Sequence, residues 1–220
     1  MKASRFEIIE NSPLTKDVYL MRLSGDTGDI TAPGQFVNIK IDGLYLRRPI
    51  SVCDINGDEL TIVYKVVGNG YDLNASGKKP VLLGGGVGVP PMYLLAKKLI
   101  AQGKDVSVVL GFNTKDELFF EDEFKALGAH TSVTTVDGSY GIKGFATDAM
   151  PENYTYFYTC GPEPMLKAVY KVTKTSGEFS FEQRMGCGFG ACMGCSCKTI
   201  TRYKRICKDG PVLRKEEILW

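Results

Sequence analysis

The sequence predicts an antiparallel β barrel, then an α/β domain with a parallel sheet, then a small cysteine-rich domain. Three observations predict this order. Short β-rich runs separated by turn signals occupy the first third of the chain. From about Lys78, strand patterns alternate with helix patterns, as in doubly wound sheets. Four of the seven cysteines then lie between Arg184 and Lys198. We therefore expect three domains, at residues 1–76, 77–176 and 177–220.

The composition narrows the class of protein. The chain has 27 basic and 25 acidic residues, and this balance indicates neither nucleic acid nor an anionic membrane as a partner. No apolar run approaches the roughly 18 residues that span a bilayer. The N-terminal "MKASRFEIIE" also lacks the apolar core of a signal peptide. We expect a cytoplasmic protein, a setting in which structural disulfides are rare.

The barrel is expected from three runs with high β propensity and partial alternation. They are "DVYLMRL" at 17–23, "QFVNIKI" at 35–41 and "ELTIVYKVV" at 59–67, with "APG" and "NGDE" turn signals between them. Short strands at this spacing are typical of a small antiparallel barrel.

An arginine pair stands beside an extended segment in "LRRPISVCD". One interpretation is a solvated pair at the rim of the barrel. The other is that Arg48 binds a diphosphate with two hydrogen bonds, while Ser51 bonds the edge of a flavin ring and Ile50 packs against it. The residues alone leave both interpretations open.

The second domain begins with the buried strand "PVLLGGG", followed by the helix "PPMYLLAKKLIAQG". Pro90 and Pro91 suit the first turn of this helix, and Gly103 can end it. Further strands are expected at "DVSVVLGF", "HTSVTTVDG" and "YTYFYTCGP", with helices at "EDEFKALG" and "EPMLKAVYKVT".

Two glycine turns follow strands of this sheet. The turn with Gly85, Gly86 and Gly88 either packs a strand tightly against a helix or lets dinucleotide phosphates approach the helix N-terminus. Its spacing is not the G-x-G-x-x-G of a true Rossmann domain. The second turn is "CGP", Cys160 to Pro162 with Gly161 between them. Because both turns should meet at the carboxyl edge of the sheet, Cys160 either lines a nicotinamide pocket or is simply a buried thiol.

The cysteine loop has a diagnostic spacing. Gaps of four, two and eleven residues separate Cys187, Cys192, Cys195 and Cys207. This is the order in which plant-type ferredoxins hold a [2Fe–2S] cluster. Structural zinc usually needs two close pairs, and only one is present. An odd number of cysteines also argues against a disulfide knot. We expect Cys197 to be a spare thiol that packs as an apolar residue.

Together these segments resemble the ferredoxin–NADP reductase superfamily, and within it the electron-transfer subunits of dihydroorotate dehydrogenase B. The resemblance covers nearly the whole chain through "PGQFVNIK", "LRRPIS", "YKVVG", "LLGGGVGVPPM", "DGSYGIKGFATD", "CGPEPMLKAV", "EQRMGCGFGAC" and "CKDGPV". It implies that the four spaced cysteines are the cluster ligands. It also implies FAD contacts from one segment and one strand, namely Arg48, Pro49, Ile50 and Ser51, and Tyr64, Lys65 and Val66.

The resemblance also implies a role and a partner. Electrons would pass between NAD(H) and a catalytic dihydroorotate dehydrogenase subunit by way of FAD and [2Fe–2S], in pyrimidine (UMP) biosynthesis. Two copies of each subunit would form a heterotetramer. The sequence is shorter than the family pattern after "YKVVG" and between Thr173 and Phe181, as in a shortened member or an incomplete sequence.

Two other functions stay open at this point. One is the flavin and iron–sulfur subunit of another reductase complex, such as a hydrogenase, a sulfide dehydrogenase or a ferredoxin–NADP reductase. The other is a non-catalytic zinc-binding interaction module. No residue is expected to act as a catalytic acid or base. Lys115 and Asp116 together give no clean choice between NAD and NADP.

Overall fold

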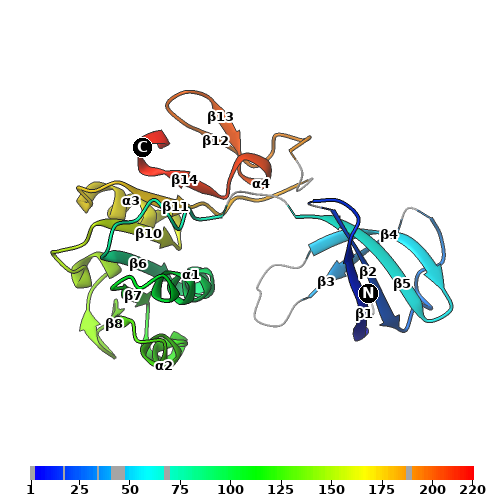
Figure 1. The fold of residues 1–220 in the computed structure, drawn as a ribbon, viewed down its shortest axis with the longest axis horizontal. Helices are drawn as coiled ribbons and strands as arrows, with labels where there is room; N and C mark the ends of the chain where they lie inside the picture. Colours follow the sequence, from blue (N-terminus) through cyan, green and yellow to red (C-terminus); the bar gives the residue numbers. More distant parts are fainter. Residues whose placement is uncertain (1–2, 17, 34, 41–47, 67–69, 187–189) are drawn as a thin grey trace. The chain divides into compact units, whose positions relative to one another are not determined.

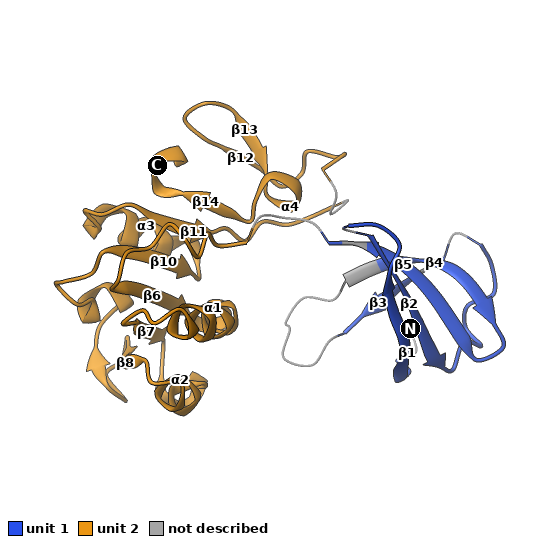
Figure 2. Cartoon of the chain, viewed as in Figure 1, with its two compact units in different colours: residues 1–67 blue, residues 68–220 orange. Residues whose placement is uncertain are grey.

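The computed structural model describes residues 3–16, 18–33, 35–40, 48–66, 70–186 and 190–220. The chain forms two compact units, residues 1–67 and 68–220 (Figures 1 and 2). The domain boundaries expected at residues 76 and 176 stay predictions.

Unit 1 is an antiparallel half-barrel sheet in the order β1-β2-β5-β4-β3. Its strands are β1 (Phe6–Pro13), β2 (Val18–Gly25), β3 (Phe36–Ile39), β4 (Arg48–Asn56) and β5 (Glu59–Lys65). Each β-rich run of the sequence overlaps one of these strands, namely β2, β3 or β5. Gly57, at φ 58°, sits in the tight turn between β4 and β5, where a left-handed residue is needed. Leu23, Leu60 and Ile62 are the buried centre of this unit, and Leu23 and Leu60 face each other across β2 and β5.

Unit 2 is built on a seven-stranded sheet in the order β14-β11-β10-β6-β7-β8-β9. Six of its strands are parallel: β6 (Pro80–Gly85), β7 (Ser107–Phe112), β8 (His130–Thr135), β9 (Ile142–Lys143), β10 (Tyr156–Cys160) and β11 (Gly177–Ser180). The last strand, β14 (Val212–Arg214), pairs with β11 in the antiparallel sense. The alternation of strands and helices that predicted a parallel sheet is therefore confirmed.

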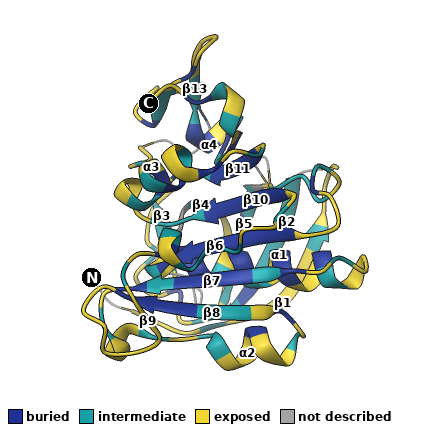
Figure 3. Ribbon diagram, turned by 90° about the vertical axis from the view of Figure 1, so that its left-hand side faces the viewer, coloured by how far each residue is buried: buried dark blue, intermediate teal, exposed yellow. Residues whose placement is uncertain are grey.

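Helices cover both faces of this sheet. On one face α1 (Val89–Ala101) and α2 (Glu121–Ala126) pack against Leu82, Val108 and Leu110. On the other face α3 (Glu163–Val172) packs against residues that alternate with these, including Val81 and Leu83. The central strands β6 and β7 are buried on both sides, as Figure 3 shows.

Short 3₁₀ helices link the elements of unit 2: η1 (Gly86–Gly88), η2 (Lys115–Glu117), η3 (Ala146–Ala149) and η4 (Lys215–Glu217). The C-terminal region adds the hairpin of β12 (Ser196–Lys198) and β13 (Tyr203–Arg205), followed by α4 (Ile206–Asp209). Because β14 belongs to the main sheet, this region shares a core with that parallel sheet. None of the helices in the described ranges has the length and hydropathy of a bilayer span.

Candidate cofactor sites

The two predicted glycine turns meet at the carboxyl edge of the parallel sheet. β6 and β10 are direct neighbours, with Gly84 opposite Cys160. A Cβ atom on Gly88 would lie 2.1 Å from the carbonyl oxygen of Cys160, so two backbone segments touch there. A Cβ on Gly85 would lie 3.2 Å from Cδ of Pro162. The sequence prediction that these turns lie side by side is therefore confirmed, and packing alone accounts for glycine at 88.

Gly86 differs from its neighbours. Its φ of 50° is left-handed, and a Cβ there would meet nothing within 4 Å. It therefore borders open space rather than packed backbone. The helix N-terminus beside it has no side-chain cap, but Pro90 and Pro91 lack the N–H groups that would bind a phosphate. Any attraction of α1 for an anion thus rests on its dipole and on the η1 backbone.

Cys160 ends β10 at this edge. It is half-buried, and its burial raises the pKa of the thiol to about 11, so the side chain is neutral at physiological pH. Tyr71 anchors the same strand end by donating a hydrogen bond to the Thr159 carbonyl oxygen (2.9 Å). A neutral thiol can lie against an uncharged ring without the cost of burying a thiolate.

The expected flavin-binding residues lie in β4 and at the end of β5. Antiparallel pairing of these strands places the start of β4 and the end of β5 at one end of the sheet. Ile50 packs against the half-barrel core and Ser51 is exposed. Tyr64 stacks on Tyr19, with ring centroids 5.7 Å apart, and its hydroxyl donates to the Asn11 side chain.

The remaining flavin candidates are less defined. Val66 is exposed. The backbones of Arg48, Pro49 and Lys65 lie in their strands, but their side chains are outside the described part. The diphosphate contact expected of Arg48 therefore stays a prediction.

Three of the four expected cluster cysteines lie in the described part, and Cys187 lies outside it. Cys195 and Cys207 are 2% and 4% exposed, and the Cys207 N–H donates to the Cys195 Sγ at 3.4 Å. Cys192 is exposed and its Sγ accepts the Gly194 N–H at 3.4 Å. Cysteine sulfurs that accept backbone N–H bonds, in a loop closed by a hairpin, fit an iron–sulfur cluster.

The structure describes six of the seven cysteines. None of the six described cysteines is in a disulfide. No three His, Cys, Asp or Glu side chains of the described ranges converge as ligands of one metal ion. Cys197, the expected spare, is half-buried against the core beside α3, and burial raises its pKa.

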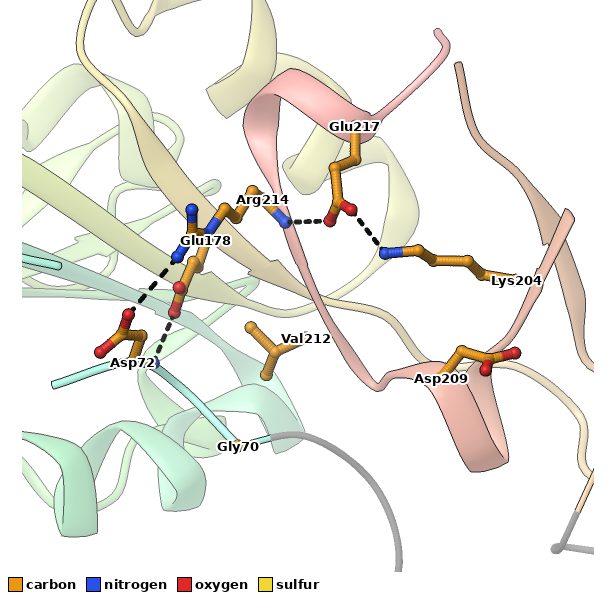
Figure 4. Close-up of a pocket in the computed structure, with 8 residues that line it drawn as sticks. All are labelled: Gly70, Asp72, Glu178, Lys204, Asp209, Val212, Arg214 and Glu217. Carbon is orange, nitrogen blue, oxygen red and sulfur yellow. Dashed lines mark hydrogen bonds and ion pairs between the residues drawn. The ribbon is translucent and has the colours of Figure 1, made fainter. Parts of the chain in front are cut away.

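Sequence reasoning missed a polar cavity of about 230 Å³ in unit 2 (Figure 4). Glu178 of β11 is 3% exposed and accepts the Asp72 N–H at 2.9 Å, and burial raises its pKa. Arg214 of β14 pairs with the Asp72 carboxylate at 3.5 Å. No sequence signal could reveal this group, because only the β11–β14 pairing brings it together. The interactions tie the start of unit 2 to its last strand.

Comparison with known proteins identifies two domains. Residues 182–219 match the iron–sulfur cluster binding domain of dihydroorotate dehydrogenase B, and residues 82–171 match the oxidoreductase NAD-binding domain. These matches support the predicted cysteine ligands as an iron–sulfur set rather than a zinc site.

Curated relatives align over the full length. The electron transfer subunit of dihydroorotate dehydrogenase B (NAD(+)) from Geobacillus sp. (strain WCH70) is 40% identical over 256 positions, covering 100% of this chain and 99% of the relative. The same subunit from Fusobacterium nucleatum is 41% identical over 257 positions, covering 99% of each chain. Since this chain has 220 residues, at least 36 of the 256 positions have no counterpart in it. This agrees with the shortened segments expected from the sequence.

A solved structure shares the fold. An NADH-dependent reduced ferredoxin-NADP oxidoreductase, studied for flavin-based electron bifurcation, is 30% identical with a TM-score of 0.63. The match covers 98% of this chain and 90% of that one. The predicted fold class and the predicted resemblance are confirmed.

Proposed function

The chain belongs to the family of electron-transfer subunits of dihydroorotate dehydrogenase B, and we propose that it passes electrons between NAD and a catalytic dihydroorotate dehydrogenase subunit. The observation that carries this proposal is the cysteine set, whose spacing, N–H···S bonds and domain match agree. The role belongs to pyrimidine (UMP) biosynthesis, as the family name indicates. The chain is accordingly an oxidoreductase subunit whose substrate chemistry takes place on the partner.

Three cofactors follow from this role: FAD, a [2Fe–2S] cluster and NAD(H). When bound, FAD exchanges two electrons with nicotinamide and single electrons with an iron–sulfur cluster, which links the two kinds of carrier. The flavin-based enzyme with 30% identity supports FAD in this chain.

The residues of this chain divide into three binding sets. We assign the cluster to Cys187, Cys192, Cys195 and Cys207. The dinucleotide is assigned to the carboxyl edge of the parallel sheet, at Gly85, Gly86, Gly88, Cys160, Gly161 and Pro162. FAD is assigned to the β4 and β5 end of the half-barrel, at Arg48, Pro49, Ile50, Ser51, Tyr64, Lys65 and Val66.

The partner is the catalytic subunit that the family name implies. We propose a heterotetramer with two copies of each subunit, working in the cytoplasm. The exposed Cys192 and the exposed loop around it offer the surface through which an electron can leave the chain.

The test is to express the chain with its native partner and measure FAD, iron, sulfide and dihydroorotate oxidation by NAD. Cys207→Ser should lose iron and abolish NADH-driven reduction of the partner while FAD is retained. Cys197→Ser is the matched control and should keep its iron. Unchanged iron in Cys207→Ser, or a partner inert toward dihydroorotate, would contradict the proposal.

A further inference from the structure

The turn between Cys192 and Cys195 contains a residue in an unusual backbone conformation. Met193 has a φ of 60°, one of two non-glycine residues with positive φ in the described part of the chain. An L-residue with a branched or long side chain avoids this region because its Cβ crowds the following carbonyl. Something in the surroundings must therefore hold Met193 there.

The holding contacts come from Ser196, the first residue of β12. The Met193 carbonyl oxygen accepts two hydrogen bonds from this one residue, from the backbone N–H at 3.1 Å and from the side-chain Oγ at 2.7 Å. A main-chain turn of this kind needs only the first bond. The hydroxyl adds a second, short bond to the same acceptor.

The other edge of the same peptide plane faces a cluster ligand. A trans peptide places its C=O and the next N–H on opposite sides, so the orientation of the Met193 carbonyl fixes that of the Gly194 N–H. That N–H donates to the Cys192 Sγ at 3.4 Å. The peptide is thus held from one side by Ser196 and directed at sulfur on the other.

We propose that Ser196 is a positioning residue that tunes the reduction potential of the cluster through the Met193–Gly194 peptide. The inference rests on the proposed iron–sulfur function and adds to it a specific residue that sets part of the reduction potential of the cluster. N–H···S hydrogen bonds stabilise the extra negative charge of the reduced cluster and so raise its potential. Without the Ser196 hydroxyl the left-handed Met193 is held less firmly, and the Gly194 N–H spends less time on sulfur.

The experiment is an EPR-monitored dithionite titration of the purified complex. Ser196→Ala should make the cluster potential more negative, shifting the reduction equilibrium about threefold, which corresponds to roughly 30 mV at 59 mV per tenfold. Ser196→Thr keeps the hydroxyl and should restore the original potential. Ser12→Ala removes a comparable exposed hydroxyl bond, to Glu10 in unit 1, and should leave the potential unchanged.

A background variant covers the case in which Ser196→Ala binds too little iron to titrate. Met193→Gly removes the cost of the left-handed conformation, so the loop can still bind the cluster without the Ser196 hydroxyl. Because glycine is also freer to leave this conformation, the orientation of the Gly194 N–H still depends on the bond from Ser196. The double variant Met193→Gly/Ser196→Ala should then titrate at a more negative potential than Met193→Gly alone. Equal potentials with and without the Ser196 hydroxyl, in either background, overturn the inference. Absence of a [2Fe–2S] signal in the unmodified complex would instead refute the proposed function.

Discussion

Single residues at the carboxyl edge of the parallel sheet have different physical roles although the sequence presents them as one glycine-rich motif. Gly88 is required by backbone packing against Cys160, whereas Gly86 borders open space. Replacing one of these glycines with alanine, which adds a Cβ atom, therefore has an effect that depends on the position. The distinction follows from what each Cβ would meet.

Gly88→Ala is expected to lower the free energy of unfolding by about 1–3 kcal/mol, because its Cβ would overlap the Cys160 carbonyl. The overlap should also displace the "CGP" turn and weaken NAD binding. Urea unfolding and NADH titration measure the two effects. Gly70→Ala is the control, since a Cβ there meets nothing within 4 Å. A Gly88→Ala protein as stable as Gly70→Ala would contradict the packing argument.

The buried thiol of Cys160 leads to a prediction about how its alkylation rate depends on pH. Its thiol has a pKa of about 11, raised by burial, and only the thiolate is alkylated. The rate of iodoacetamide modification should therefore rise about tenfold per pH unit from pH 8 to 10 without levelling off. Peptide mapping by mass spectrometry follows this one cysteine. Since the folded pKa lies above that of an unfolded thiol, the same group costs stability as the pH rises above about 8.5. A rate that levels off below pH 9 would show an ordinary thiol.

At the scale of elements, β14 joins the cysteine-rich region to the nucleotide-binding sheet. Leu213 of β14 is 1% exposed and belongs to the same core as Cys195, Cys207 and Phe179 of β11. Two of the proposed cluster ligands, Cys195 and Cys207, are thus packed against the NAD-binding sheet rather than carried on a separate domain. Loss of packing at β14 should therefore disturb the positions of Cys195 and Cys207.

Leu213→Ala is expected to cost about 2–5 kcal/mol of unfolding free energy and to lower the iron retained after purification. The reason is that the cavity would open between β14 and the core that holds Cys195 and Cys207. Iron per chain and thermal unfolding are the measurements. Leu94→Ala, at an exposed position of α1, should change neither. Full iron retention in Leu213→Ala would show that the ligands do not depend on this strand.

Sequence patterns were sufficient where structure is local or where neighbouring strands follow a general rule. The runs that became β2, β3 and β5 were found from β propensity, and Pro90 and Pro91 correctly marked the first turn of α1. The meeting of Gly88 with Cys160 followed from the rule that carboxyl ends of parallel strands share an edge. Spacing alone selected the four cysteines that we propose as cluster ligands.

Features that depend on the pairing of distant segments could not be predicted from the sequence. The Glu178 group could not be predicted, because it requires β14 to return and pair with β11 from more than thirty residues away in sequence. Nothing local marks Glu178 as buried, and carboxylates are usually exposed. The left-handed Met193 was also unforeseen, since methionine carries no preference for that conformation. Both features depend on contacts made only in the folded chain.

At the scale of the whole molecule, each unit has its own hydrophobic core. The core residues of unit 2 all come from residues 71–218, and those of unit 1 from residues 6–62. A chain with divided cores can fold in parts. We therefore expect the two units to have separable stabilities.

A protein consisting of residues 68–220 is expected to fold and to bind iron and sulfide, but not FAD. Its visible spectrum should show iron–sulfur bands without flavin bands, and circular dichroism should show a cooperative transition. Adding Cys207→Ser to this fragment should remove the iron–sulfur bands and leave the fold. An insoluble or colourless fragment would show that unit 2 depends on unit 1.

The position of β14 in the chain has a consequence for biogenesis. The edge of β11 stays open to other strands until residues 212–214 have left the ribosome, and an open edge invites aberrant pairing. Leu213 and Ile218 belong to the same buried core as Cys195 and Cys207, so the surroundings of these two proposed ligands are also incomplete until this segment has been made. We therefore expect iron to enter only after Val212–Arg214 have paired with β11, and a nascent polypeptide stalled before Val212 should be a substrate for chaperones rather than for cluster-delivery factors.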